Sequence, residues 1–352
     1  MSQKLIFTNR PAEALDNLLA DNTYNRIFVI ADENSAKLAL PKLGASKIIA
    51  DAKVIDIPAG DINKGLDSVS KIWSELGNNG ASRRSLVINV GGGMVTDLGG
   101  FAASTFKRGI DFINVPTTLL GAVDAAVGGK TGINFNGLKN EIGVFNEASA
   151  VVISTIFYDT LPLYELKSGF AEMLKHALLS NEDSLNKLLK YDFESHGYDT
   201  LLALLKESVE VKRKVVLEDP HEKGIRRALN LGHTAGHAFE SLAMQRKAPV
   251  AHGYAVAWGL VAELTISNMQ TSFDSKILTR MANFIYEQYG AFRITCDDYD
   301  TILELMRHDK KSNAGELNFT LLKAVGIVKI DYTITADEVK NALDIYRDFM
   351  HI

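Results

Sequence analysis

The chain has 352 residues, of which 46% are hydrophobic, and this is enough to bury the cores of two domains. Its formal net charge of −5 gives no global basic field, so nucleic acids and anionic membrane surfaces are not expected partners. The single cysteine, Cys296, excludes an intramolecular disulfide, and the longest apolar stretch is shorter than the roughly 20 residues that a membrane span needs. We therefore expect a soluble, cytoplasmic protein.

The first 160 residues alternate β-rich runs with helical patterns, which predicts a parallel sheet with helices on its faces. The expected strands are KLIF (4–7), RIFVIAD (26–32), AKVIDIPAG (52–60), SLVINVGGG (85–93) and DFINVPTT (111–118). Helical patterns between them include LDSVSKIWSELG (66–77) and MVTDLGGFAASTF (94–106). We interpret residues 1–160 as a Rossmann-like α/β domain.

Residues 161–352 have a different hydrophobic pattern, with long amphipathic segments, and this predicts a mainly helical domain. Long amphipathic segments cover residues 163–180, 199–219, 254–270 and 275–290. The apolar pair around LNFTLLKAVGIVKI (317–330) is compatible with a hairpin. Thr335 and Glu338 form the pattern of a capping box at the start of a last helix.

A glycine cluster, Gly91–Gly93, lies between an expected strand and an expected helix. Three glycines let the backbone approach a phosphate closely, and the helix N-terminus offers free N–H groups, although such a cluster can also be a tight turn. Asp97 is placed to bind a ribose hydroxyl or to stabilise the helix dipole. Asp61 and Lys64 belong either to the same nucleotide site or to an ordinary solvated loop.

Two histidines stand four residues apart in the helical stretch LNLGHTAGHAFE (229–240). On a helix, His233 and His237 share one face and can reach one ion, or the surrounding glycines and alanine can mark close helix packing. Glu172 lies among apolar residues of another helix, and His252 precedes a further one. A His/His/Glu set with an open position is a catalytic zinc site, and the spacing does not choose between His237 and His252.

Basic and amide side chains are numerous in the segments near these histidines. The segment VGGKTGINFNGLKN (127–140) is expected to be a loop that carries Lys130, Lys139 and Asn140. Lys175, Lys212, Arg226, Asn230 and the pair Lys310 and Lys311 are the other candidates. Taken singly, each charge is more typical of a solvated surface. Taken with a metal site, they indicate a small polyanion, because phosphate and carboxylate groups favour Lys and Arg donors.

The order of these motifs resembles that of the 3-dehydroquinate synthases, a family of the sugar phosphate cyclase superfamily. The resemblance covers about residues 57–326. It is carried by GGGMVTDLGGFAASTFKRG, VPTTLLGAVDAAVGGKTGIN, LKNEIGVF, LKSGFAEMLKHAL, LNLGHTAGHAFE and AHGYAVAWG. It implies a homodimer whose NAD-binding α/β domain (1–160) precedes a helical metal- and substrate-binding domain (161–352), with one divalent metal, Zn²⁺ or Co²⁺, per subunit.

The resemblance also implies a role for individual residues. Metal ligands fall on Glu172, His233 and His252, and proton transfer falls on His237 and Glu222. Contacts with NAD fall on Asp32, Asn34, Asp61, Lys64, Gly92, Gly93, Asp97, Thr117, Thr118, Lys139, Phe157, Thr160 and Ser168. Substrate contacts fall on Asp124, Lys130, Asn140, Lys175, Lys212, Arg226, Asn230 and Lys310, and Arg108 is expected to reach the site of the partner subunit.

The implied reaction converts 3-deoxy-D-arabino-heptulosonate 7-phosphate to 3-dehydroquinate and phosphate, a step of the shikimate route. Among the departures from the family pattern, Asp61 stands where Gly-Glu is usual, Pro220 and Tyr254 replace acidic residues, and Ser168 replaces an asparagine. The competing hypotheses are another sugar phosphate cyclase, one that forms 2-deoxy-scyllo-inosose for example, a glycerol dehydrogenase-type enzyme, and a non-catalytic binding protein. Arg226 and Asn230 favour 3-dehydroquinate synthase over another cyclase, because the substrates of the other cyclases lack a carboxylate for these residues to bind.

Overall fold

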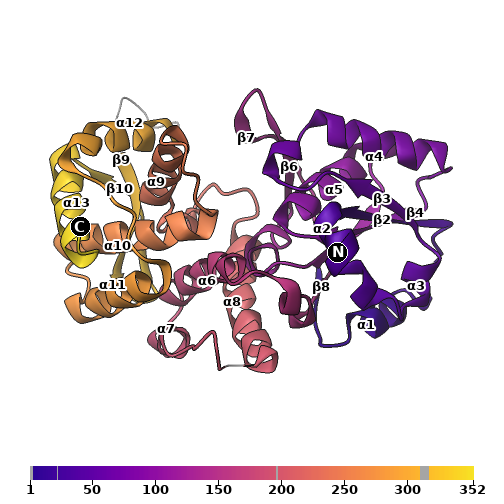
Figure 1. The fold of residues 1–352 in the computed structure, drawn as a ribbon, viewed down its shortest axis with the longest axis horizontal. Coiled ribbons are helices and arrows are strands. Elements are labelled where there is room, and N and C mark those ends of the chain that lie inside the picture. The colour runs from indigo at the N-terminus through magenta and orange to yellow at the C-terminus, as the bar shows by residue number, and fades with distance from the viewer. Residues whose placement is uncertain (1–2, 22, 196, 310–316) are drawn as a thin grey trace. The chain divides into compact units, whose positions relative to one another are not determined.

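The computed structural model describes residues 3–21, 23–195, 197–309 and 317–352, with the side chains of 308 and 309 left out. Lys310 and Lys311, both predicted near the substrate, lie outside the described residues. The chain forms two compact units (Figure 1). Unit 1 comprises Met1–Leu166 and His196–Val209, and unit 2 comprises Lys167–Ser195 and Glu210–Ile352.

Unit 1 is built on a six-stranded parallel sheet of order β1-β8-β5-β4-β2-β3. Its strands are β1 (Lys4–Phe7), β2 (Arg26–Asp32), β3 (Lys53–Ile57), β4 (Ser85–Gly91), β5 (Asp111–Pro116) and β8 (Ala150–Ile153). The five expected strands are confirmed. Strand β8 was missed because its four apolar residues, AVVI, give too short a run to distinguish a strand from a buried loop. Every residue of β4 is buried, as in a parallel sheet covered on both faces.

Helices connect these strands in the α/β manner predicted from the sequence. They are α1 (Pro11–Leu18), α2 (Glu33–Leu38), α3 (Lys47–Ala50), α4 (Leu66–Asn78) and α5 (Gly93–Thr105), with short turns η1 (Leu40–Leu43), η2 (Asp61–Asn63), η3 (Phe106–Arg108), η4 (Gly121–Ala125) and η5 (Thr155–Thr160). Helix α5 packs very closely on the sheet, because a Cβ atom at Gly99 would lie 2.0 Å from the Asn89 Oδ1 atom. This contact holds the middle of α5 against β4, and α5 begins at Gly93, just after the carboxyl end of β4 at Gly91.

The prediction of a loop over residues 127–140 is wrong for most of that segment. Strands β6 (Lys130–Phe135) and β7 (Leu138–Phe145) form an antiparallel hairpin there, separate from the main sheet. The glycines that suggested a loop allow the two strands to approach instead. A Cβ atom at Gly143 would lie 2.4 Å from the Thr131 carbonyl oxygen, so a larger residue would push the strands apart.

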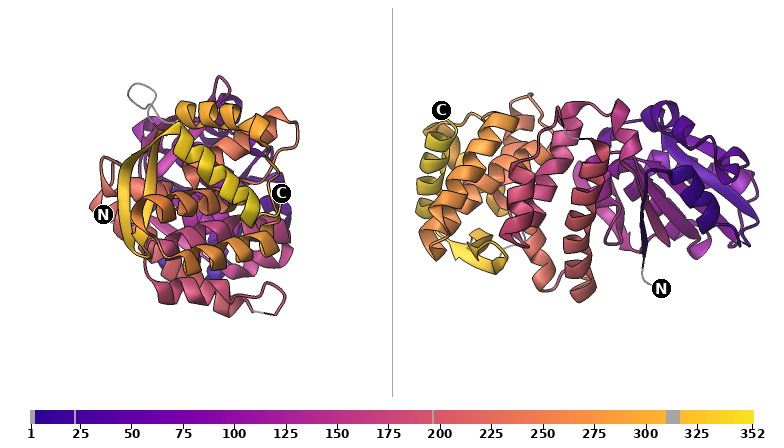
Figure 2. Two further views of the ribbon diagram at one scale, coloured as in Figure 1. Left: turned by 90° about the vertical axis from the view of Figure 1, so that its left-hand side faces the viewer. Right: turned by 90° about the horizontal axis from the view of Figure 1, so that it is seen from below.

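Unit 2 is mainly helical, as expected. Its elements include most of α6 (Leu163–Leu178), then α7 (Glu182–Leu189), part of α8 (Tyr198–Glu218), η6 (Ile225–Asn230), α9 (His233–Gln245), α10 (His252–Thr271), α11 (Ser275–Tyr289), η7 (Cys296–Asp298), α12 (Tyr299–Asp309), β9 (Leu317–Ala324), β10 (Ile327–Ile334) and α13 (Ala336–Phe349). Helix α10 is the central element, and α9, α11, α13 and β9 pack against it. Figure 2 shows the orange and yellow helices of this C-terminal part lying beside one another.

Two local predictions for unit 2 are confirmed. Strands β9 and β10 pair antiparallel as the expected hairpin. Thr335 and Glu338 form the expected capping box, in which the Glu338 N–H donates to Thr335 Oγ1 and the Thr335 N–H donates to Glu338 Oε2 at 2.8 Å.

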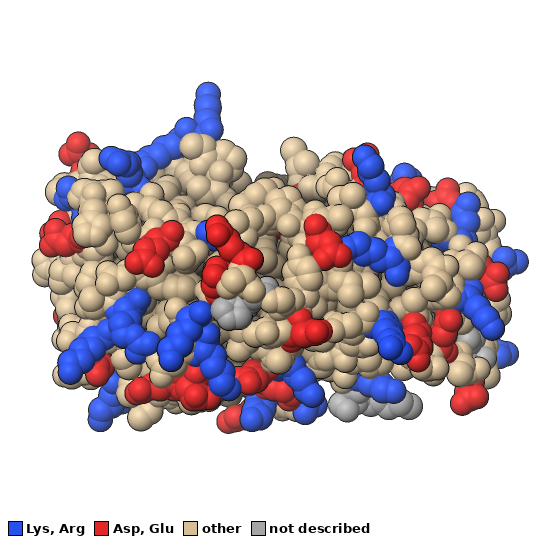
Figure 3. Space-filling view, turned by 60° about the horizontal axis from the view of Figure 1, so that its bottom comes forward, with Lys and Arg blue, Asp and Glu red and all other residues tan. Residues whose placement is uncertain are grey.

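The surface charges and the hydropathy of the helices match the expectations drawn from the modest net charge and the short apolar stretches of the sequence. Acidic and basic side chains are interspersed on the face drawn in Figure 3. Within the described ranges, the helices are too short or too polar to cross a bilayer.

Candidate active site

The first turn of α9 is held by a buried carboxylate from α10. Glu263 is fully buried, and its two oxygens accept hydrogen bonds from the N–H groups of Gly232, at 2.6 Å, and Ala235, at 3.0 Å. Gly232 has a φ of 79°, a left-handed conformation that favours glycine, immediately before His233. The sequence did not assign Glu263 to the site, although a single acidic residue inside an apolar helix is a signal of such a contact.

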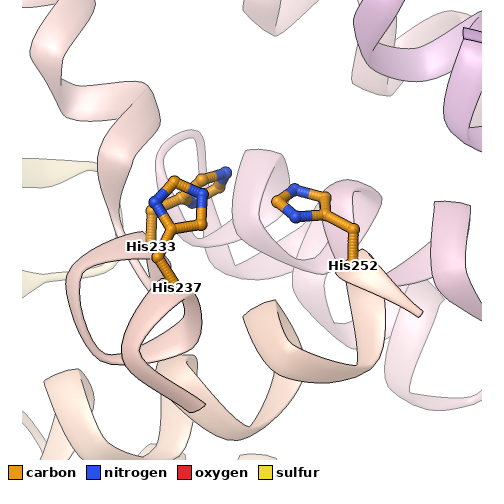
Figure 4. A group of neighbouring side chains, drawn as sticks. All are labelled: His233, His237 and His252. Atoms are coloured by element: carbon orange, nitrogen blue, oxygen red, sulfur yellow. The ribbon is translucent and has the colours of Figure 1, made fainter. Parts of the chain in front are cut away.

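Three histidines converge beside this turn (Figure 4). His233 and His237 come from the first two turns of α9, and His252 begins α10. One ring nitrogen of each lies within 4.8 Å of the others, and the ring centroids are 5.2–5.7 Å apart. The sequence could not choose between His237 and His252 as the second metal-ligand candidate, and the structure places both of them beside His233.

Glu172 joins the histidines from α6 and is fully buried. Its Oε1 atom lies 3.5 Å from His233 Nε2 and 3.6 Å from His252 Nε2, and its Oε2 atom contacts the Lys175 ammonium. The two Oε1 distances are long for hydrogen bonds. A tetrahedral metal ion with bonds of ~2.0–2.1 Å holds its ligand atoms about 3.4 Å apart, so each of these two distances is close to that of a ligand pair on one ion.

Hydrogen-bond acceptors on the far side of each ring orient two of these histidines. His233 Nδ1 lies 3.1 Å from the Leu231 carbonyl oxygen, and His252 Nδ1 lies 3.2 Å from Glu240 Oε2. When each Nδ1 carries the proton and donates it to its acceptor, the lone pair is on Nε2 and faces Glu172. In that tautomer the candidate donors are a carboxylate and two neutral imidazoles, the ligand types of a catalytic zinc site.

The electrostatics of the cluster differ between the two histidines that face Glu172. Burial raises the pKa of Glu172, but the Lys175 ammonium and the two imidazoles outweigh it and hold that pKa well below its usual range. Burial and the Lys175 charge lower the pKa of His233 well below its usual value. Burial also opposes protonation of His252, but Glu172 and Glu240 raise its pKa to about 10. The two carboxylates thus stabilise a cation at His252, whether a proton or a metal ion.

Three of the predicted cationic residues in unit 2 are buried rather than solvated. Lys175, Lys212 and Arg226 have exposed fractions of 1%, 6% and 3%. A single charged residue is more typically solvated, but that interpretation is wrong for these three residues. Burying a cation is costly without a negative partner, so their burial indicates a binding role or a built-in ion pair, and Glu172 is such a partner for Lys175.

The turn η6 carries two further predicted substrate residues. Arg226 Nη1 donates to the Pro220 carbonyl oxygen at 2.6 Å, and Asn230 Nδ2 donates to Glu222 Oε1 at 3.4 Å. The backbone carbonyl makes the Pro220 contact, so proline in place of an acidic residue does not remove it. Glu222 has a φ of 57° and is half-buried beside this turn.

Two departures from the family pattern lie where α6 meets α10. Ser168, predicted near the nucleotide, is buried in unit 2, and its Oγ atom accepts from the Gly253 N–H at 3.1 Å. A Cβ atom at Gly253 would lie 1.8 Å from the Ser168 carbonyl oxygen, so glycine is required beside His252. Tyr254 packs against the rings of Trp258 and Tyr289.

Unit 1 has a cavity of about 310 Å³ at the carboxyl ends of its strands. Seven predicted NAD residues line it: Asp32, Asn34, Gly92, Thr117, Thr118, Phe157 and Thr160. Gly91–Gly93 have no positive φ, and the space around them is limited by packing, since a Cβ atom at Gly91 would lie 2.4 Å from Val95 Cγ2. A Cβ atom at Gly92 would lie 3.1 Å from Thr118 Cγ2, inside the lining of the cavity.

A second group of predicted residues gathers around Lys64, which is only 4% exposed. Its ammonium contacts Asp97 Oδ2 at 2.6 Å and also the Asn140 side-chain oxygen. Asp61 joins the group through Asn134, whose side-chain amide donates to Asp61 Oδ2 at 3.1 Å. The ordinary-solvated-loop interpretation of Lys64 is therefore wrong.

The remaining predicted residues of unit 1 are less enclosed. Lys130 and Lys139 are exposed on the β6–β7 hairpin, Asp124 is half-buried in η4, and Gly93 begins α5. Arg108 is exposed, with a φ of 71°, and lines a shallow basic cavity with Ser82, Arg83 and Lys107.

Comparison with known proteins assigns the family. The N-terminal domain of 3-dehydroquinate synthase matches residues 54–168, and the C-terminal domain of 3-dehydroquinate synthase matches residues 169–312. The chain belongs to the 3-dehydroquinate synthase family. A 3-dehydroquinate synthase from Parabacteroides distasonis is 46% identical over 346 residues, which cover 98% of each chain.

Solved structures of two more distant enzymes share the fold of this chain. A 2-epi-5-epi-valiolone synthase from Streptomyces hygroscopicus subsp. jinggangensis, with NAD⁺ and Zn²⁺ bound, has a TM-score of 0.84 at 23% identity and covers 99% of this chain and 97% of its own. A 2-deoxy-scyllo-inosose synthase complexed with carbaglucose-6-phosphate, NAD⁺ and Co²⁺ has a TM-score of 0.81 at 23% identity, covering 96% and 95%. The predicted fold class is confirmed.

Proposed function

We propose that this protein converts 3-deoxy-D-arabino-heptulosonate 7-phosphate to 3-dehydroquinate and phosphate. It would be a carbon–oxygen lyase acting on phosphates in the shikimate route to chorismate and the aromatic amino acids. The observation that carries the proposal is the full-length 46% identity with a 3-dehydroquinate synthase, joined to the buried Glu172, whose carboxylate lies 3.5 and 3.6 Å from the half-buried His233 and His252. The other cyclases share the fold at only 23% identity.

We propose Glu172, His233 and His252 as the ligands of one Zn²⁺ or Co²⁺ ion. The donor types and the 3.5 and 3.6 Å spacings fit such an ion. When bound, it would polarise a substrate oxygen and stabilise negative charge on it. His237 lies beside this set without being needed to complete it, which favours a separate role in proton transfer, shared with Glu222.

NAD is the proposed cofactor of unit 1. When bound, it would accept a hydride from the substrate and return it later in the same turnover. The cavity lined by Asp32, Gly92 and Thr118 and the Lys64–Asp97 pair support this assignment. We assign the other predicted contacts of unit 1, Asn34, Asp61, Gly93, Thr117, Lys139, Phe157 and Thr160, to the same cofactor. Ser168, the remaining predicted contact, belongs to unit 2.

The substrate carries a phosphate and a carboxylate, and the buried cations of unit 2 suit both. Lys175, Lys212 and Arg226 would hold these groups and neutralise the charge that develops as phosphate leaves. Asp124, Lys130, Asn140, Asn230 and Lys310 are the remaining proposed substrate contacts. Because these groups fix one conformation, the protein needs few dedicated bases, and His237 has the geometry of an imidazole base near the metal ligands.

The functional division proposed for the chain is an NAD-binding domain over residues 1–160 and a metal- and substrate-binding domain over residues 161–352. The last helical element of the first domain, η5, ends at Thr160, and α6, which carries Glu172, begins at Leu163. We further propose a cytoplasmic homodimer. The proposal follows the single cysteine, the modest charge and the expected role of Arg108 at a partner subunit.

The primary test measures phosphate release from 3-deoxy-D-arabino-heptulosonate 7-phosphate with NAD and Zn²⁺ or Co²⁺ present, while NADH absorbance is followed. Stoichiometric phosphate and dehydroquinate without accumulating NADH are expected, because the hydride returns within each turnover. No release by folded, metal-loaded protein would reject this activity in favour of another sugar cyclase. Steady NADH production from a polyol would instead identify a dehydrogenase.

The shared-site hypothesis predicts complementation between two inactive variants. Arg108→Ala lacks the group supplied to the partner, and Lys130→Ala lacks a group of its own site, so a mixed dimer contains one site with both groups intact. We expect mixtures to regain up to about a quarter of wild-type activity when subunits exchange at random, measured as phosphate release. Isotope-labelled native mass spectrometry should verify the mixed dimers, and inactivity of verified mixed dimers would refute a shared site.

A further inference from the structure

Glu240 lies on the same face of α9 as the two histidines of that helix. His233, His237 and Glu240 are separated by four and three residues, which places all three side chains on one helical stripe. Glu240 is 9% exposed and follows Phe239, which is fully buried. A carboxylate in such surroundings is costly unless a cation or a donor accompanies it.

The partner of Glu240 is the proposed metal ligand that comes from the other helix. Its Oε2 atom lies 3.2 Å from His252 Nδ1, and His252 Nε2 lies 3.6 Å from Glu172 Oε1. The imidazole of His252 thus lies between two carboxylates, one at each nitrogen. The corresponding acceptor for His233 is a neutral backbone carbonyl, that of Leu231. The two histidines are therefore supported differently, and only His252 depends on a side chain.

We infer that Glu240 is a positioning residue that fixes the ring orientation and Nδ1–H tautomer of His252 and strengthens Nε2 as a ligand through its negative charge. The inference rests on the proposed metal centre, which it deepens. A hydrogen-bonded carboxylate behind a ligating imidazole raises its basicity, and loss of such a partner typically costs 10–100-fold in metal affinity, as an order of magnitude. One helix thereby supplies a ligand, a proton-transfer histidine and the support for a ligand on α10.

Two variants separate the hydrogen bond from the charge. Glu240→Gln keeps an oxygen that can accept from Nδ1–H but removes the charge, whereas Glu240→Ala removes both. Glu287→Gln is the matched control, because Glu287 is exposed on α11 of the same unit. Zinc affinity is measured by competition with a chromophoric chelator, the cobalt site by its visible absorption spectrum, and folding by thermal unfolding of each metal-free protein.

The expected order of zinc affinity is wild type and Glu287→Gln, then Glu240→Gln, then Glu240→Ala, with a loss of about 10–100-fold for alanine and a smaller loss for glutamine. A changed cobalt spectrum for the alanine variant is expected too, since a freed imidazole alters the ligand geometry. If Glu240→Ala does not fold, weakened zinc binding by folded Glu240→Gln supports the inference. If the folded variants keep the wild-type zinc affinity and cobalt spectrum, the role of Glu240 is refuted while the proposed metal centre stands. Failure of the wild-type protein to bind either metal would overturn the proposed centre together with it.

Discussion

Glu172→Gln should remove metal binding and lower turnover by about a thousandfold or more, on the scale of losing a group that stabilises developing charge. Glutamine supplies a neutral ligand in place of the anionic one and leaves the Lys175 ammonium, 1% exposed, without its carboxylate. Breaking a buried ion pair from one side costs about 3–5 kcal/mol in the free energy of unfolding. Zinc stoichiometry, phosphate release and denaturant unfolding measure the three consequences.

A second substitution separates stability from catalysis. Glu172→Gln combined with Lys175→Met removes both charges, so the double variant should unfold at higher denaturant than Glu172→Gln alone while remaining inactive. Glu182→Gln, on the exposed first turn of α7, is the matched control and should behave as wild type. Stoichiometric zinc bound at wild-type affinity by Glu172→Gln would contradict its role as a ligand.

The two histidines of α9 should separate metal binding from proton transfer. His233→Ala is expected to lose zinc and activity together, because its Nε2 atom faces Glu172 at 3.5 Å. His237→Ala is expected to keep zinc and lose turnover by about 10²–10⁴-fold, the usual contribution of a general acid or base. Zinc content by mass spectrometry and phosphate release are measured on the same preparations.

The control for this pair is His351→Ala, whose side chain is exposed near the C-terminal end of the chain. It should retain both zinc and turnover. Zinc retained by His233→Ala would overturn the ligand assignment. Zinc lost from His237→Ala would show instead that the three histidines form the ligand set, which their mutual distances also permit.

Local patterns predicted most of the secondary structure. Strong apolar runs such as RIFVIAD and SLVINVGGG became β2 and β4, and the Thr335–Glu338 capping box begins α13. The errors arose where a local signal was ambiguous. Strand β8 has only four residues, and the glycines of β6 and β7 indicated a loop although they allow two strands to come together.

Long-range contacts explain what the sequence missed in the site. Glu240 and Glu263 were not assigned a role, because a single acidic residue in a helix gives no local sign of its partner. Glu240 meets His252 across two helices, and Glu263 meets the first turn of α9 across 28 and 31 residues. The burial of Lys212 and Arg226 was likewise not visible from their charged neighbours in the sequence.

By itself, the sequence determined the α/β and helical halves of the chain and the family, and it supplied the candidate acid, histidine and lysine side chains of the site. Periodicity and glycine placement are local properties, and the order of motifs follows the chain, so all three can be recognised in the sequence without a structure. Only the tertiary structure decided that Glu172 Oε1 lies 3.5 and 3.6 Å from His233 and His252 and that His237 lies beside these two histidines. Those distances depend on how α6, α9 and α10 pack, through close contacts such as Gly253 against Ser168, and such packing is set by residues far apart in the chain.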